Sequence, residues 1–199
     1  IYPTNDKGWI IYSSEDAVLL KQNQCGEIEW AKDFDIDNSS CCIGDEVVIS
    51  SAQNITILTR EYDGSYYGYR VTQFSNTGTV NWSKVFTNPQ REYYPYALLL
   101  DNNEDLIIYG NETQVGGGAG FMTVNKLDQQ GNTIWTKQID NGVVWGAALA
   151  TRDNGCLIRS GDKFIKLDVN GDIQWFQQYQ APGTYYYIAP IEVDDGYIF

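Results

Sequence analysis

The feature that most constrains the fold is a glycine followed four residues later by a tryptophan, which occurs four times. The copies are CGEIEW (25–30), TGTVNW (77–82), QGNTIW (130–135) and NGDIQW (170–175). Internal repeats with periods of roughly 20–50 residues are typical of propellers and solenoids. The chain is therefore expected to use one small structural unit several times.

A second landmark precedes each copy. Asp or Asn, mostly followed by Gly, stands between apolar runs in DKGWII (6–11), NEDLII (103–108), DNGCLI (153–158) and DDGYIF (194–199), with a degenerate AQNITI (52–57). Such residues accept positive φ cheaply, so they predict tight hairpin turns. Each repeat is therefore expected to contain four strands. In the third repeat they are 94–101, 105–111, 121–128 and 132–139, and in the fourth 143–151, 156–160, 164–168 and 172–179.

Four antiparallel strands repeated in tandem, without a helical period, predict an all-β chain, a β-propeller built of four-stranded blades. We expect one domain over 1–199 with blades near 1–42, 43–92, 93–140 and 141–182, and a partial blade at 183–199. Because both ends offer overlapping pieces of a blade, we expect a piece of a ring of six to eight blades. A complete four-bladed ring with a redundant tail, or blades completed between chains, are the alternatives.

The repeated tryptophan has a structural interpretation. Period-two alternation in the last strand would place Ile28, Trp30 and Lys32 on one face. The indole could then lie against the neighbouring blade, while the lysine protects an exposed outer edge. The alternative is that the tryptophans line a ligand site. The predicted blade-packing residues are Trp30, Trp82, Trp135 and Trp175.

Two of the repeats share a longer phrase, Lys-Leu-Asp-x-x-Gly-x-x-x-Trp, at 126–135 and 166–175, and a third has Thr77, Gly78 and Trp82. In these positions the chain resembles a family of secreted β-propeller repeats and, more remotely, the quinoprotein-like (PQQ-like) propellers. The resemblance implies a scaffold or binding role. It also suggests a quinone cofactor, but the basic and catalytic residues of such sites have no match, so no cofactor is expected.

Composition excludes several classes of function. The net charge of −13 with scattered basic residues argues against a nucleic-acid partner. No stretch approaches the roughly 20 apolar residues that span a bilayer, so membrane insertion is not expected. The chain has no histidine, which removes the commonest general base and zinc ligand. We therefore predict no catalytic residues and no enzyme activity, and an extracellular or cell-surface location.

Aromatic residues are the strongest ligand candidates. They fall where one blade is expected to lead into the next, so they would gather on one face and could stack on sugars or grip a protein loop. The alternative is that these rings fill gaps between blades. The candidates are Tyr93, Tyr94, Tyr96, Trp145, Tyr185, Tyr186 and Tyr187.

Three weaker candidates remain. Asp33, Asp35 and Asp37 resemble the start of a calcium loop, but the following Gly and bidentate Glu are missing, so a solvated connector is favoured. Cys25, Cys41, Cys42 and Cys156 are not expected to pair unless four blades close a ring. Four glycosylation sequons occur, three of them in predicted turns or connectors, at Asn38, Asn54, Asn81 and Asn111.

The sequence thus favours a non-catalytic extracellular β-propeller that acts as a binding or scaffold module for a protein partner, within a larger chain or assembly. The alternative is a lectin-like propeller that binds glycans through the aromatic face. A quinone-dependent oxidoreductase is not favoured.

Overall fold

A computed structural model describes residues 1–13, 18–33, 46–62, 64–118, 120–140, 146–179 and 189–198. The chain divides into two compact units, Ile1–Tyr94 and Pro95–Phe199. Within the described ranges every regular element is a β-strand. The same part of the chain holds no helix long and apolar enough to cross a membrane.

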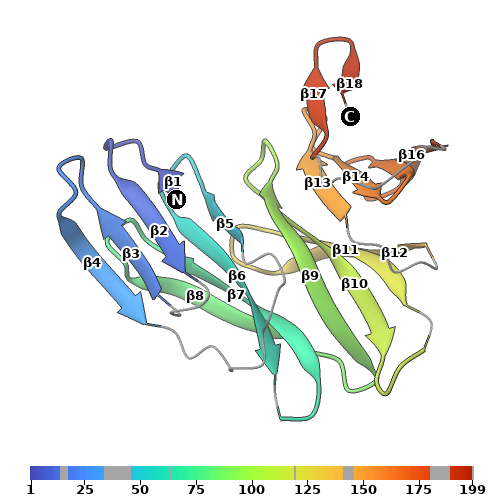
Figure 1. Ribbon diagram of the computed structural model, residues 1–199, viewed down its shortest axis with the longest axis horizontal. Helices are drawn as coiled ribbons and strands as arrows, with labels where there is room; N and C mark the ends of the chain where they lie inside the picture. Colours follow the sequence, from blue (N-terminus) through green and yellow to red (C-terminus); the bar gives the residue numbers. More distant parts are fainter. Residues whose placement is uncertain are drawn as a thin grey trace. The chain divides into compact units, whose positions relative to one another are not determined.

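The strands form four sheets of four strands and one hairpin, each in chain order (Figure 1). Blade 1 contains β1 (Tyr2–Pro3), β2 (Trp9–Ser13), β3 (Val18–Gln22) and β4 (Ile28–Asp33), and blade 2 contains β5 (Glu46–Ile49), β6 (Ile55–Tyr62), β7 (Tyr67–Phe74) and β8 (Val80–Phe86). Blade 3 contains β9 (Arg91–Leu100), β10 (Leu106–Gln114), β11 (Phe121–Leu127) and β12 (Thr133–Asp140). Blade 4 contains β13 (Gly146–Ala150), β14 (Cys156–Ser160), β15 (Lys163–Leu167) and β16 (Ile173–Gln178). The hairpin pairs β17 (Ile191–Val193) with β18 (Gly196–Ile198).

These sheets confirm the predicted fold class, an all-β chain of four-stranded antiparallel blades of the β-propeller kind. Blade 3 begins at Arg91, two residues before the predicted boundary. The strands predicted for the third and fourth repeats agree with the observed ones to within three residues at each end. The prediction succeeded because it used turn chemistry, which is local.

The same turn closes the first and last hairpins of each four-stranded blade. In the turn after β15, the N–H of Gly171 donates to the carbonyl of Asp168, and Gly171 has φ +77°. The carboxylate of Asp168 also accepts from the N–H groups of Asn170 and Asp172, at 2.8 and 2.9 Å. An acceptor at the first position and a residue tolerant of positive φ at the fourth therefore define the turn. We call the turn of the first hairpin of each blade its inner turn and that of the last hairpin its outer turn. The positive-φ residues of the four inner turns are Lys7, Gln53, Glu104 and Asn154.

One prediction about the tryptophans is wrong: Trp30 does not share a face with Ile28. Lys21 pairs with Trp30 but Gln22 pairs with Ile28, so the outer strand carries one extra residue. Since successive residues of β3 point to opposite faces, Trp30 and Ile28 do so as well. The same register shift occurs in the other three blades, opposite Gln73/Phe74, Lys126/Leu127 and Lys166/Leu167. Because the β-bulge occurs at the same position in every blade, each of these tryptophans pairs with a lysine or glutamine of the preceding strand.

Each compact unit contains a core between two sheets. In the N-terminal unit, Ile10 and Leu19 of blade 1 meet Ile55, Ile57 and Phe74 of blade 2. The C-terminal unit has the equivalent core, in which blade 3 contributes Ile107, Tyr109, Met122 and Val124, and blade 4 contributes Cys156, Ile158, Ile165 and Leu167. Within each unit the two blades therefore face each other with alternate residues of their strands.

Candidate functional site

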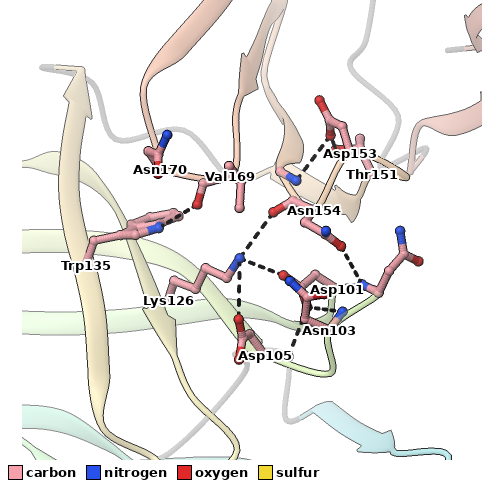
Figure 2. Close-up of polar contacts among 12 residues, drawn as sticks. Asp101, Asn103, Asp105, Lys126, Trp135, Thr151, Asp153, Asn154, Val169 and Asn170 are labelled. Carbon is pink, nitrogen blue, oxygen red and sulfur yellow. Dashed lines mark hydrogen bonds and ion pairs between the residues drawn. The ribbon is translucent and has the colours of Figure 1, made fainter.

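The outer-strand tryptophans dock on the following blade. In the C-terminal unit the indole Nε1 of Trp135 donates to the carbonyl of Val169 at 2.9 Å (Figure 2). In the N-terminal unit Trp30 donates to the carbonyl of Asn76 at the same distance of 2.9 Å. Both acceptors stand two residues before the turn glycine of the next blade. We call this turn glycine, together with the carbonyl two residues before it, the tryptophan socket.

Besides adopting a positive φ, the socket glycine leaves space for the tryptophan ring. A Cβ added at Gly78 would lie 2.8 Å from a ring atom of Trp30. One added at Gly171 would lie 3.0 Å from the Trp135 ring and 2.8 Å from Lys137. Within each unit the Gly-x-x-x-Trp phrase therefore serves docking: Gly78 and Gly171 receive the tryptophan of the preceding blade, and Trp30 and Trp135 are the tryptophans that enter these sockets.

The structure describes other contacts for the outer-strand tryptophans Trp82 and Trp175. Trp82 is half-buried, with the Lys84 ammonium 6.0 Å from its ring centroid. The Trp175 ring lies 5.9 Å from that of Tyr197 in the β17–β18 hairpin. Trp175 therefore packs on a tyrosine instead of a turn glycine.

We expect Gly78→Ala to lower the free energy of unfolding by about 2 kcal/mol more than Gly26→Ala. Both glycines have φ near +80°, at +77° and +81°, so both variants carry the same backbone strain. An added Cβ at Gly26 meets no atom within 4 Å, whereas at Gly78 it meets the Trp30 ring. Urea titration of the two variants isolates the docking contribution, and equal losses would contradict it.

A buried lysine of blade 3, Lys126, forms a second contact between blades. The side chains of Lys126 and Asp101 are 2% and 0% exposed, and their Nζ and Oδ2 atoms lie 2.6 Å apart. Lys126 Nζ also donates to the carbonyl of Asn154 in blade 4 at 3.3 Å and lies 3.7 Å from Asp105 (Figure 2). The buried ammonium of Lys126 requires the carboxylates of Asp101 and Asp105, because a buried charge without an oppositely charged partner destabilises the fold.

Blades 1 and 4 also pair a buried lysine with an acid of the first hairpin turn, within the same blade. Lys21 lies 2.5 Å from Asp6, and Lys166 lies 2.8 Å from Asp153. Blade 2 has Gln73 at the lysine position, and its inner turn has Ser50, Ala52 and Asn54 where the other blades place their acids. The Gln73 amide instead donates to Thr56 at 3.4 Å. Lysine and acid are therefore present together or absent together.

Side chains of the inner turns add a third contact. The N–H of Asn102 in blade 3 donates to Asn154 Oδ1 in blade 4 at 3.1 Å. In the N-terminal unit, the N–H of Asn5 donates to Gln53 Oε1 at 2.9 Å. Both acceptors are the positive-φ residues of their turns. The backbone conformation of that residue thus aims its side chain at the preceding blade.

Acid should weaken the lysine–acid contacts. Hydrogen bonds from Lys21 and then Thr4 lower the pKa of Asp6 to about 2. Burial alone would raise the pKa of Asp153, but hydrogen bonds from Lys166, Thr151 and Gly155 together hold it below its usual range. A depressed carboxyl pKa contributes stability above the unfolded-state value of 3.8, and this is lost as pH falls through the folded-state value.

We therefore expect the free energy of unfolding to fall between about pH 4 and pH 2, and Asp6→Asn to flatten that slope. Urea titrations at several pH values measure this. The control is Asp194→Asn, at a side chain that is 98% exposed, which should leave the slope unchanged. An unchanged slope in Asp6→Asn would contradict the assignment.

The described aromatic candidates are packed. Tyr93 is 8% exposed and its ring lies 4.7 Å from that of Tyr69. Tyr94 is half-buried beside Tyr67, with the Arg60 guanidinium 3.9 Å from the Tyr67 ring and 4.6 Å from the Tyr94 ring. Burial, and next the hydrogen bond to Glu92, raise the pKa of Tyr94 to about 12, so its hydroxyl stays a donor. Tyr96 packs on Tyr109 at 5.7 Å. Trp145, Tyr185, Tyr186 and Tyr187 lie outside the described residues.

A cavity of about 400 Å³ lies in the N-terminal unit between the end of β4 and the β6–β7 hairpin. β6 and β7 have 8 residues each, while β2 and β3 have 5, so blade 2 extends beyond blade 1. One face of β6 carries Ile55 and Ile57 where blade 1 covers it, and Thr59 and Glu61 beyond that point. The volume suits a small ligand. We call this site the seam cavity.

The polar groups of the seam cavity are held in place. Arg70 donates to both carboxylate oxygens of Glu61, through Nε at 2.9 Å and Nη2 at 2.6 Å. This pairing raises the pKa of Arg70. Arg70 also donates to Ser83 at 3.4 Å, and the Ser83 and Thr72 hydroxyls lie 2.9 Å apart. Paired donors and acceptors over the apolar floor of Phe74 suit an uncharged, hydrogen-bonding ligand.

Lys32 and Asp33, at the end of β4, and Arg60 in β6 complete the charged lining. With the Arg70–Glu61 pair, the lining carries one more positive than negative charge. The cavity therefore offers both donors and acceptors without favouring a multiply charged ligand.

Of the predicted metal and thiol candidates, the structure describes Asp33, Cys25 and Cys156. Asp33 is exposed, while Asp35 and Asp37 fall outside the described ranges, which contain no cluster of three or more potential metal ligands. Cys25 is an exposed free thiol in the β3–β4 turn. Cys156 is buried and free, and burial raises its pKa to about 12. Cys41 and Cys42 also fall outside the described ranges.

One predicted glycosylation site is wrong. Asn111 lies within β10 and is 4% exposed, so a glycan could not attach there without opening the sheet. The Asn81 amide nitrogen, which would carry a glycan, donates to Gln73 at 3.1 Å and to Asn54 at 3.3 Å. Asn54 is half-buried, and Asn38 lies outside the described residues.

Sequence reasoning missed the lysine–acid contacts and the seam cavity. A signal for the first was available, because Lys-Leu-Asp in two repeats accompanies an Asp in the inner turn. For the seam cavity the signal is fainter. One face of β6 changes from apolar to polar at Thr59, and the same face of β7 changes at Thr72.

Comparison with known proteins supports the fold alone. No protein-family model matches the chain, and no curated protein matches its sequence. A solved protein of unknown function from Bacteroides caccae is similar at a TM-score of 0.59 and 12% identity, over 94% of this chain and 62% of that one. A eukaryotic initiation factor structure matches at a TM-score of 0.41 and 8% identity, over 89% of this chain and 52% of that one. The chain thus spans less than two thirds of either protein. The chain is therefore similar in fold to the Bacteroides protein.

Proposed function

We propose that the chain is a non-catalytic binding or scaffold module of the β-propeller kind, extracellular or on the cell surface, with a protein partner. The observation that carries the proposal is the seam cavity, in which Arg70 is held by both oxygens of Glu61. A guanidinium fixed in advance loses little conformational freedom when it binds a ligand, because its partners already order it. Docked blades supply the rigid support that such a site requires.

The partner's chemistry follows from the lining. Hydroxyl and charged groups alternate above an apolar floor, where Lys32, Arg60 and Arg70 stand beside the carboxylates of Asp33 and Glu61. A turn or loop of a protein partner presents amide donors and acceptors with small apolar groups, which this lining can match. We therefore favour a peptide loop as the occupant.

A glycan is the second candidate. Tyr93, Tyr94 and Tyr96 are packed, so the support for this function comes from the hydroxyls of Thr72 and Ser83 beside the Arg70–Glu61 pair. Saccharide hydroxyls both donate and accept, as these groups do. The seam cavity would then be the sugar site.

We expect Arg70→Lys to weaken ligand binding at least tenfold, because an ammonium cannot reproduce the paired hydrogen bonds of a guanidinium. A glycan array and a library of displayed peptide loops, each screened with the wild type and this variant, measure the effect. Thr79→Ala, in an outer turn, is the control and should bind as the wild type does. Hits insensitive to Arg70→Lys in both screens would contradict the proposal.

A further inference from the structure

Blade 1 carries a tryptophan socket that no tryptophan among the described residues of the N-terminal unit enters. Gly78 and Gly171 each lie against the tryptophan of the preceding blade, whereas a Cβ added at Gly26 meets no atom within 4 Å. The turn itself is the same: the N–H of Gly26 donates to Asn23, and its φ is +81°. Blade 1 thus presents a formed docking turn on an uncovered side.

The sheet face next to this socket is also apolar and uncovered. Trp9 is 44% exposed and Ile28 is 60% exposed. The residues at the position of Trp9 in blades 2 and 4, Ile55 and Cys156, lie against a neighbouring sheet and are each 1% exposed. The position of Ile28 is exposed in those blades too, at Val80 (52%) and Ile173 (54%), so Trp9 is the residue that distinguishes blade 1. Ile11 and Leu20, which pair across β2 and β3, continue the same face between Trp9 and Ile28. An apolar face of this kind marks an interaction surface.

Charge identifies the incoming strand more closely. Where blade 3 docks on blade 4, Lys137, two residues after Trp135, donates to Asp172 at 2.8 Å. Asp172 directly follows the socket glycine, and in blade 1 that position is Glu27. Glu27 is exposed and accepts from the Asn23 amide at 2.7 Å, which holds the carboxylate beside the socket. The socket therefore suits a strand with a lysine two residues after its tryptophan.

We propose that the uncovered face of blade 1 docks a further four-stranded sheet of the same repeat, whose outer strand carries Gly-x-x-x-Trp-x-Lys. Its tryptophan occupies the Gly26 socket and donates to the carbonyl of Gln24, and its lysine pairs with Glu27. A second copy of this chain fits less well. Its Trp175 already packs on Tyr197 and is followed two residues later by Gln177 instead of lysine. The proposal does not depend on the seam cavity.

The test extends the whole chain by a copy of residues 91–147 placed before Ile1, so that the added blade precedes blade 1 as blade 3 precedes blade 4. Cys25 adjoins Gly26 and is exposed, so its alkylation rate reports on the socket. We expect at least tenfold slower alkylation of Cys25 in the extended chain, mapped by mass spectrometry. Changing the tryptophan of the added copy to alanine should restore the original rate.

Two further variants make the test specific. Glu27→Lys in the extended chain should restore part of the alkylation rate by repelling the incoming lysine, and Gly26→Leu should restore it fully. Equal alkylation rates in the extended and original chains would overturn the proposal. So would concentration-dependent protection of Cys25 in the original chain that Gly26→Leu abolishes, because this would assign the socket to a second copy.

Discussion

Replacing Trp135 by alanine is expected to lower the free energy of unfolding by about 3 kcal/mol. The ring fills the space above Gly171, and its Nε1 atom donates to the carbonyl of Val169. Because the ring is half-buried, the loss should lie at the lower end of values for buried tryptophans. Urea unfolding followed by circular dichroism measures the change.

The chain provides a matched control in Trp9. Its side chain is 44% exposed on the uncovered face of blade 1. Trp9→Ala should therefore lower the free energy of unfolding by less than about 1 kcal/mol. Equal losses in the two variants would mean that residue type, and not docking on a socket, decides the effect.

Lys126→Gln is expected to lower the free energy of unfolding by about 3–5 kcal/mol. The variant leaves the Asp101 side chain, which is 0% exposed, without the cation that neutralises it. The remaining carboxylate, Asp105, would then face Asp101 with no positive charge between them. Burial, and next the charge of Asp101, already raise the pKa of Asp105. Thermal and urea unfolding both report the loss.

Blade 2 supplies the design of a rescue. It has Gln73 at the lysine position, with Ser50 and Asn54 at the positions of Asp101 and Asp105. The triple variant Lys126→Gln, Asp101→Ser, Asp105→Asn should therefore recover most of the lost stability. Serine can keep the turn bond, since Ser50 Oγ accepts from the N–H of Asn54 at 3.1 Å. A triple variant as unstable as Lys126→Gln alone would show that the lysine does not act through its acids.

The sequence predicts the blades well because their signals are local. Gly26 and Gly171 reveal turns through a conformation that few other residues adopt. Docking was predicted for a similar reason, since an indole with a fixed place in every repeat needs a fixed partner. The face of that indole could not be predicted. A bulge opposite Lys21 and Gln22 reverses the alternation, and it depends on pairing between strands.

The candidate site was less predictable. The seam cavity results from a difference in strand length between blades 1 and 2, which a repeat alignment obscures by treating the blades as equal. The burial of Tyr93 and Tyr96 could not be predicted, because the exposure of a side chain depends on neighbours distant in the sequence. Tyr93 packs on Tyr69, and Tyr96 packs on Tyr109. A pattern along the chain gives no information about such pairs.

Within each compact unit, one socket glycine, Gly78 or Gly171, receives the tryptophan of the preceding blade. Nuclear Overhauser contacts between the indole ring of Trp30 and the α-protons of Gly78 measure this most directly, together with slow exchange of the Trp30 indole proton that is bonded to Asn76. We expect both observations, and the same pair for Trp135 and Gly171. A Trp30 ring without contact to Gly78, with an indole proton that exchanges as fast as that of Trp9, would contradict the account.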